Sequence, residues 1–209
     1  MILLSHFFFG FLFSFIGSIT PSMLNMTALK ISLEKGQQKN NWYAIGVAIF
    51  AIPQITVAVF LTNYIIERPT ILETIEKVGI FIFLILSAYF YKLSKKENKQ
   101  LEGHTNLKSN PFLTGIILSL LNVFSVPFFC GLIVGLDYFN LFSYELLPVT
   151  FFSFGAVVGT FYILYLYGKF SHTIRKKTGK LTKNIHLILA IITGFVGIFT
   201  LLKLFFKWI

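Results

Sequence analysis

Long apolar runs, separated by short basic segments, dominate this sequence. The hydrocarbon core of a bilayer is about 30 Å thick, so a helix needs about 20 apolar residues to cross it. The runs are continuous rather than alternating, which favours helices over the strands of a barrel. We expect six spans, at residues 3–29, 42–64, 71–91, 111–136, 146–167 and 185–202.

The composition excludes most other classes of protein. Hydrophobic residues make up 56% of the chain and charged residues 12%, whereas soluble proteins contain about 25% charged residues. The single Cys130 cannot form a disulfide within its own chain. A net charge of +10 could suit a nucleic-acid partner, but the basic residues lie between apolar runs, where anionic lipid headgroups and membrane orientation explain them. We therefore expect an all-α integral membrane protein whose partner is the lipid bilayer and not nucleic acid.

The distribution of basic residues predicts an orientation. With six spans, most of the 18 Lys and Arg residues follow the first, third and fifth spans. The positive-inside rule then places these loops in the cytoplasm and both termini outside. The third span is the weakest, because Glu73, Glu76 and Lys77 occupy its first turns. A five-span chain without it has almost the same charge bias, so charge does not choose between the two.

An internal repeat favours six spans. A pattern of four positions in the first span recurs with the same spacing in the fourth, with three of the four residues identical, and a proline follows each copy, at Pro21 and Pro127. The two copies are Phe7, Gly10, Ser14 and Gly17, and Phe112, Gly115, Ser119 and Asn122. The repeat predicts one transporter domain with halves at residues 1–94 and 110–209 and a basic cytoplasmic linker at 95–109. An odd number of spans in each half inverts the halves, as in alternating-access transporters.

The two prolines predict interruptions within the first and fourth spans, since each lacks an amide hydrogen and crowds the preceding turn. We expect Thr20 to cap a half-helix over residues 22–34, with Pro21 as its first residue, and Ser125 to play the same part before Pro127. The amide groups at such a helix start attract anionic groups. The alternative is an ordinary proline kink that only shapes helix packing.

Uncharged polar residues near these interruptions are the candidates for binding a substrate, although buried amides also commonly join neighbouring helices. The candidate substrate-binding residues are Thr20, Pro21, Ser22, Asn25, Gln54, Asn122, Ser125 and Pro127. The acidic residues and the histidines lie in loops or near span ends, so the sequence shows no catalytic group, metal-ligand cluster or cofactor motif. Glu76 is the least peripheral acid, and either coupling to an ion or pairing with Lys77 would explain it.

Two other sets of residues are assigned to structure. Aromatic residues near span ends, including Tyr43 and Tyr167, are expected to form belts at the membrane interfaces. Glycines inside the spans are expected to allow close helix packing. The glycines of this set are Gly10, Gly17, Gly46, Gly155, Gly159, Gly194 and Gly197.

The layout of nearly the whole chain resembles the lysine-exporter (LysE/RhtB) translocator family of bacterial inner-membrane amino-acid exporters. The resemblance rests on a proline motif that ends the first span, a polar turn, and matching residues in later spans. These are Pro21, Glu34-Lys35-Gly36, Gly46, Lys77-Val78-Gly79, Phe112, Gly115, Asn122, Phe128-Phe129, Gly194 and Gly197.

Three motifs of that family are altered in this chain. Its Pro-Gly-Pro stands here as Pro21-Ser22-Met23, and its Asn-Pro as Asn122-Val123, with the proline displaced to Pro127. The Gly-Asp typical of its second span falls on Phe50-Ala51, which removes an acid. The resemblance therefore implies the family and fold more firmly than the substrate.

The resemblance implies a secondary transporter and not an enzyme. Its substrate would be an amino acid or similar small zwitterion, exported through a site between the broken first and fourth spans while the two halves rock. The alternative is a non-transporting membrane protein with a structural or lipid-associated role. Assembly into a homo-oligomer stays open.

Overall fold

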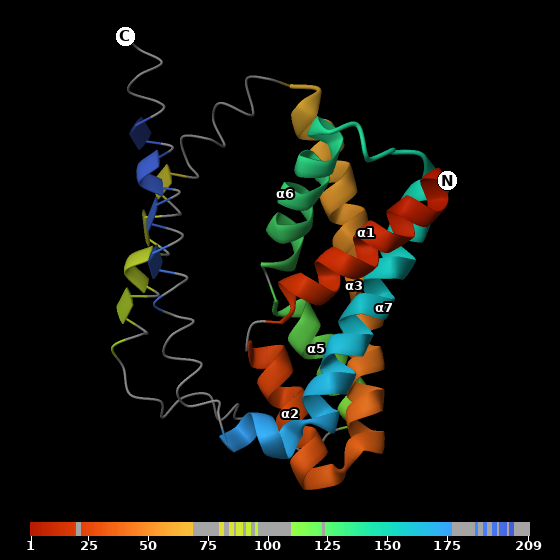
Figure 1. Ribbon diagram of the computed structural model, residues 1–209, viewed down its shortest axis with the longest axis vertical. Coiled ribbons are helices and arrows are strands. Elements are labelled where there is room, and N and C mark those ends of the chain that lie inside the picture. The colour runs from red at the N-terminus through yellow and green to blue at the C-terminus, as the bar shows by residue number, and fades with distance from the viewer. Residues whose placement is uncertain are drawn as a thin grey trace. The chain divides into compact units, whose positions relative to one another are not determined.

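The computed structural model describes residues 1–19, 22–68, 110–122 and 124–176, together with single residues in 80–95 and 187–202. All regular secondary structure among these residues is α-helical, in agreement with the expected all-α class. These helices are α1 (Ile2–Gly17), α2 (Met23–Lys35), α3 (Gln37–Ile66), α5 (Pro111–Leu120), α6 (Ser125–Tyr138) and α7 (Leu146–Lys169), as Figure 1 shows.

The chain forms two compact units that do not coincide with the two halves expected from the repeat. One unit contains Met1–Tyr64 and Leu101–Arg175, and the other contains Ile65–Gln100 and Lys176–Ile209. The first unit thus draws helices from both halves of the sequence. In the second unit, the hydroxyl of Ser87 donates to the carbonyl of Ala190 at 2.8 Å. Most of the expected third span, including Glu76 and Lys77, and part of the expected sixth span lie outside the described residues.

The helices differ in whether they can cross a membrane alone. Helices α3 and α7 are long and apolar enough to do so, while α1 is a shorter apolar helix. Helices α5 and α6 pass the same test only as one broken span, bent by 64°. By length and composition, the described residues therefore contain two or three spans. The expected spans at 3–29 and 111–136 are each divided into two helices, as the predicted interruptions require.

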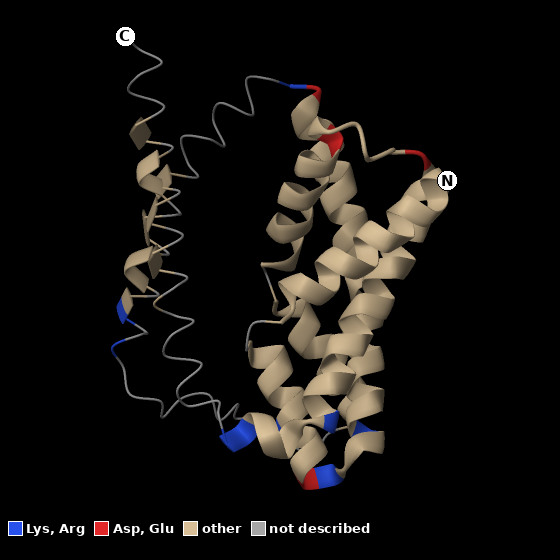
Figure 2. Cartoon of the chain, viewed as in Figure 1, with Lys and Arg blue, Asp and Glu red and all other residues tan. Residues whose placement is uncertain are grey.

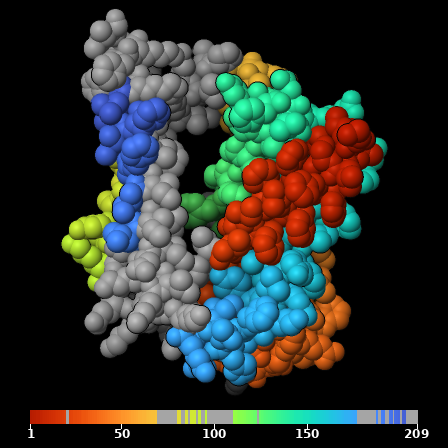
Figure 3. All heavy atoms as spheres, in the orientation of Figure 1, coloured from red at the N-terminus to blue at the C-terminus, as the bar shows by residue number. Residues whose placement is uncertain are grey.

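Glycines bring α1 and α7 into backbone contact. A Cβ atom at Gly10 would overlap the carbonyl of Phe152, and one at Gly155 would overlap the carbonyl of Phe7. Gly159 meets the carbonyl of Phe11 in the same way one turn later. Figure 3 shows the atoms of α1 lying directly against those of α7. The expected packing role is confirmed for these three glycines.

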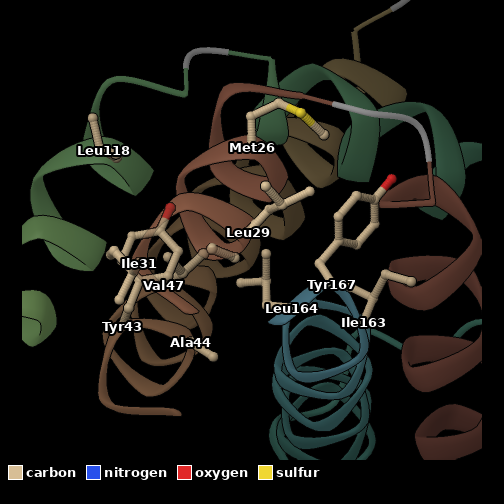
Figure 4. Close-up of a cluster of buried hydrophobic side chains, with 11 residues drawn as sticks. Met26, Leu29, Ile31, Tyr43, Ala44, Val47, Leu118, Ile163, Leu164 and Tyr167 are labelled. Carbon is tan, nitrogen blue, oxygen red and sulfur yellow. The ribbon is translucent and has the colours of Figure 1, made fainter. Parts of the chain in front are cut away.

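Helices α3 and α5 make a second contact of the same kind. A Cβ at Gly46 would overlap the carbonyl of Phe112, and a Cβ at Gly115 would overlap the carbonyl of Tyr43. Side chains from α2, α3, α5 and α7 then fill the core beside it, as Figure 4 shows. The fully buried residues of this core include Ile31, Tyr43, Ala44, Val47 and Leu164.

Charged residues of the described helices gather at their ends. Lys35 ends α2 and Lys169 ends α7, whereas Glu145 caps the start of α7 and Asp137 lies in the last turn of α6. Figure 2 shows the blue basic residues of the α2–α3 turn and the α7 end on one side, and the red acidic residues mostly on the other. In helices α1–α3 and α5–α7 the exception is Lys30, which lies in the middle of α2.

Candidate functional site

The first candidate element is the break between α1 and α2. Ser22 is the N-cap of α2: its backbone is extended, and its hydroxyl oxygen accepts the amide hydrogen of Asn25 at 3.4 Å. The expected cap at Thr20, with Pro21 as the first helical residue, is therefore wrong. The helix starts at Met23 because the cap is supplied by the next suitable hydroxyl along the chain. Thr20 and Pro21 themselves lie outside the described residues.

Two side chains satisfy the carbonyl groups at this break. The amide nitrogen Nδ2 of Asn25 donates to the carbonyl of Ser18 at 2.7 Å, and the hydroxyl of Tyr167 donates to the carbonyl of Ile19 at 2.6 Å. An unsatisfied carbonyl in hydrocarbon costs several kcal/mol, so these bonds make the interruption tolerable. The carbonyl groups of Ser18 and Ile19 therefore have protein partners at the break.

The second candidate element is the break between α5 and α6. Nδ2 of Asn122 donates to the hydroxyl oxygen of Ser125 at 2.8 Å, and the Ser125 amide donates to the Asn122 carbonyl at 3.2 Å. Ser125 is the first residue of α6, whose N-cap is Phe124 without a side-chain cap bond. The expected capping role of Ser125 is therefore wrong, because its hydroxyl is engaged by Asn122 instead.

Pro127 does not itself interrupt the helix. It lies in the first turn of α6 and is exposed. The amide groups of a first turn have no partner within the helix, so the missing hydrogen of a proline there costs nothing. The interruption precedes Pro127, and the proline is placed where a new helix can begin.

Gln54 fixes the end of α5 to α3. Its Nε2 donates to the carbonyl of Ser119 at 2.8 Å, and both residues are buried. The amide of Asn122 also donates to this carbonyl, at 3.0 Å. Gln54 therefore acts first as a link between two helices, which was the structural alternative for a buried amide.

The two breaks lie against each other. Gly17, the last residue of α1, packs against the ring of Phe128 in the first turn of α6, and any Cβ at Gly17 would overlap that ring. In Figure 1 the end of α1 reaches the segment that precedes α6. Of the candidate residues near this junction, Asn25 is 1% exposed, whereas Ser22 and Pro127 are on the surface of the described structure.

Tyr167 is the site residue that the sequence analysis missed. It is expected in an interfacial belt but is buried, and Figure 4 shows its hydroxyl oxygen pointing away from the core cluster. A signal was present: Tyr167 follows the apolar residues Ile163 and Leu164 by four and three positions, so it shares their helix face. Tyr43 is also buried rather than interfacial, but its hydroxyl donates at 3.0 Å to the carbonyl of Leu24, which lies within α2 and not at the break.

The chemistry of this junction is neutral and polar. It combines carbonyl groups at the ends of α1 and α5 with amide groups at the starts of α2 and α6. Carbonyl ends of helices carry a partial negative charge and amide ends a partial positive charge. Among the described residues, no group of three or more His, Cys, Asp or Glu is placed to hold a metal ion.

Comparison with known proteins gives the family. Neither the curated proteins nor the solved structures contain a match to this chain. A family model described as LysE type translocator matches residues 15–204, which cover most of the chain and include the break between α1 and α2 and the break between α5 and α6. With its apolar helices, this match makes the protein a membrane protein of a transporter family. The chain belongs to the LysE type translocator family.

Proposed function

We propose that this protein is a secondary transporter that exports an amino acid or similar small zwitterion across the bacterial inner membrane. The observation that carries the proposal is the contact between two broken helices, made by Gly17 of α1 and Phe128 of α6. Interrupted helices that meet inside the membrane are where transporters of this kind bind their substrates. We propose export as the direction because the resemblance is to a family of exporters.

The glycine contacts support six spans in two inverted halves. Each copy of the repeated motif packs on the second span of the other half, through the same exchange of a glycine and a carbonyl. The contacting pairs are Gly10 with Phe152, Gly155 with Phe7, Gly115 with Tyr43, and Gly46 with Phe112. A reciprocal pattern of this kind is what a twofold relation between the halves would produce.

The broken helices suit a substrate that carries both charges. The amide groups at the starts of α2 and α6 favour a carboxylate, and the carbonyl groups at the ends of α1 and α5 favour an ammonium group. Each group of a zwitterion would then be bound by backbone dipoles, without a buried charged side chain. The charge distribution further supports a cytoplasmic position for the α2–α3 turn and a periplasmic N-terminus.

Flux in liposomes tests the proposal. The purified protein should exchange radiolabelled L-alanine or L-leucine across liposomes, and Gly17→Ala should reduce this exchange about tenfold by displacing the Phe128 ring, a change of about 1.4 kcal/mol. Gly131→Ala is the matched control, because a Cβ there meets no atom within 4 Å.

Each outcome has a definite meaning. No exchange by the wild-type protein of any neutral amino acid would overturn the proposed transport and favour a structural or lipid-associated role. Equal exchange by the folded Gly17→Ala and Gly131→Ala variants would overturn the placement of the site at the two breaks.

A further inference from the structure

We infer that Tyr167 is a positioning residue of the transport site, which with Asn25 orients the carbonyl groups of Ser18 and Ile19 to receive the ammonium group of the substrate. This inference rests on the proposed transport function and adds the group that recognises one end of the substrate. It assigns the ammonium to the end of α1.

The geometry joins two helices around two consecutive carbonyls. Asn25 from α2 donates to Ser18 at 2.7 Å, and Tyr167 from α7 donates to Ile19 at 2.6 Å. The two donors come from different helices and hold consecutive carbonyls, so each side chain fixes the direction of one of them. A bond of 2.6 Å is at the short end for an O–H donor, which indicates a well-aligned contact.

The bonded carbonyls keep the capacity to bind a ligand. A carbonyl oxygen has two lone pairs, and within the part of the chain that the structure describes each of these two oxygens accepts one side-chain hydrogen bond. Both also stand just beyond the C-terminal end of α1, where the helix dipole is negative. An ammonium group, with three donors and a positive charge, matches such a pair of neighbouring acceptors. The protein donors fix the direction in which the second lone pairs point.

The corresponding place in the second half has different chemistry. The repeat aligns Gly10 with Gly115, and the same alignment places Cys130 at the position of Asn25. The glycine contacts align Gly155 with Gly46, which places Ala58 at the position of Tyr167. There the thiol of Cys130 lies 3.6 Å from the carbonyl of Ala58. No hydroxyl stands at the position of Tyr167 in that pair. The orienting device therefore belongs to the first break alone.

The experiment compares two tyrosines that differ in the carbonyl they bind. Tyr167→Phe and Tyr43→Phe remove the same atom and the same kind of bond, but Tyr43 binds a carbonyl within α2. In liposomes loaded with the wild-type protein or either variant, uptake of radiolabelled L-leucine should give a KM about tenfold higher for Tyr167→Phe, with kcat changed less than twofold. The KM of Tyr43→Phe should match that of the wild-type protein.

A competitor without an ammonium group separates positioning from folding. An excess of 4-methylpentanoate, the analogue of L-leucine that lacks the amino group, should inhibit wild-type uptake far less than unlabelled L-leucine does. The preference for the ammonium group is the ratio of inhibition by L-leucine to inhibition by 4-methylpentanoate. This ratio should fall about tenfold in Tyr167→Phe and stay unchanged in Tyr43→Phe. A role limited to folding would lower the amount of active protein and would not change the preference.

The outcomes distinguish this inference from the proposed function. If wild-type liposomes transport amino acids but Tyr167→Phe keeps its KM and its preference, the positioning role is wrong while transport stands. If wild-type liposomes show no uptake, transport itself is wrong. If Tyr167→Phe does not fold, Asn25→Ala is measured instead, and an unchanged KM in that folded variant would equally overturn the inference.

Discussion

The buried side chain of His6 links two parts of this protein through hydrogen bonds at both of its ring nitrogens. The amide of Ser143 donates to its Nε2 at 2.9 Å, so this nitrogen must be the unprotonated one. The proton is then on Nδ1, which donates to the carbonyl of Ile2 at 2.7 Å. With 1% of its surface exposed, His6 joins α1 to the segment between α6 and α7. The sequence suggested only a peripheral histidine, because its position near a span end does not reveal that this segment covers it.

Replacing His6 should destabilise the protein measurably. His6→Phe keeps a ring against Phe142 but leaves the Ser143 amide without its acceptor, which we expect to cost about 1–3 kcal/mol. Thermal unfolding in detergent would record a lower Tm. Ser5→Ala is the control, since it removes an exposed bond to the same Ile2 carbonyl and should change the Tm little. Equal Tm values for the two variants would show that the Ser143 bond contributes nothing.

Among the features of the helices, the sequence predicts some and not others. Helices α3 and α7 were predicted well, because the length of an apolar run is a local property. The breaks were predicted near the prolines, but the cap was misplaced, since Thr20 and Ser22 are both good N-cap residues and propensity does not choose between them. The role of Tyr167 depends on which faces of α2 and α7 meet, and a single sequence does not contain that information.

The contact between α1 and α7 offers a direct test at this scale. Gly155→Leu places a side chain where the carbonyl of Phe7 lies, so we expect the helices to separate and the folded yield and Tm to fall by the equivalent of about 1–3 kcal/mol or more. Gly135→Leu in α6 is the matched control, as a Cβ there has no atom within 4 Å. Similar Tm values for both variants would mean that the glycine contact does not hold these helices together.

For the molecule as a whole, the separation of charge predicts its orientation in the membrane. Gln38 in the basic α2–α3 region and Glu145 at the start of α7 are both exposed. In a Cys130→Ala background, a membrane-impermeant maleimide should label Glu145→Cys in intact cells. It should label Gln38→Cys only after the membrane is opened. The reverse pattern would place the N-terminus in the cytoplasm and would remove the support for the proposed orientation.

The glycine contacts also restrict how such a molecule could change shape. Backbones that touch through Gly10 and Gly155 on one side, and through Gly46 and Gly115 on the other, cannot slide without collision. Each of these helix pairs contains one helix from either half of the sequence, so a rotation of one half against the other would separate both pairs. We therefore expect α1 with α7, and α3 with α5, to move as rigid bodies. We expect any such movement to bend the chain where α1 ends at Gly17 and where α5 ends at Leu120, because no regular helical turn has to be broken at a helix end.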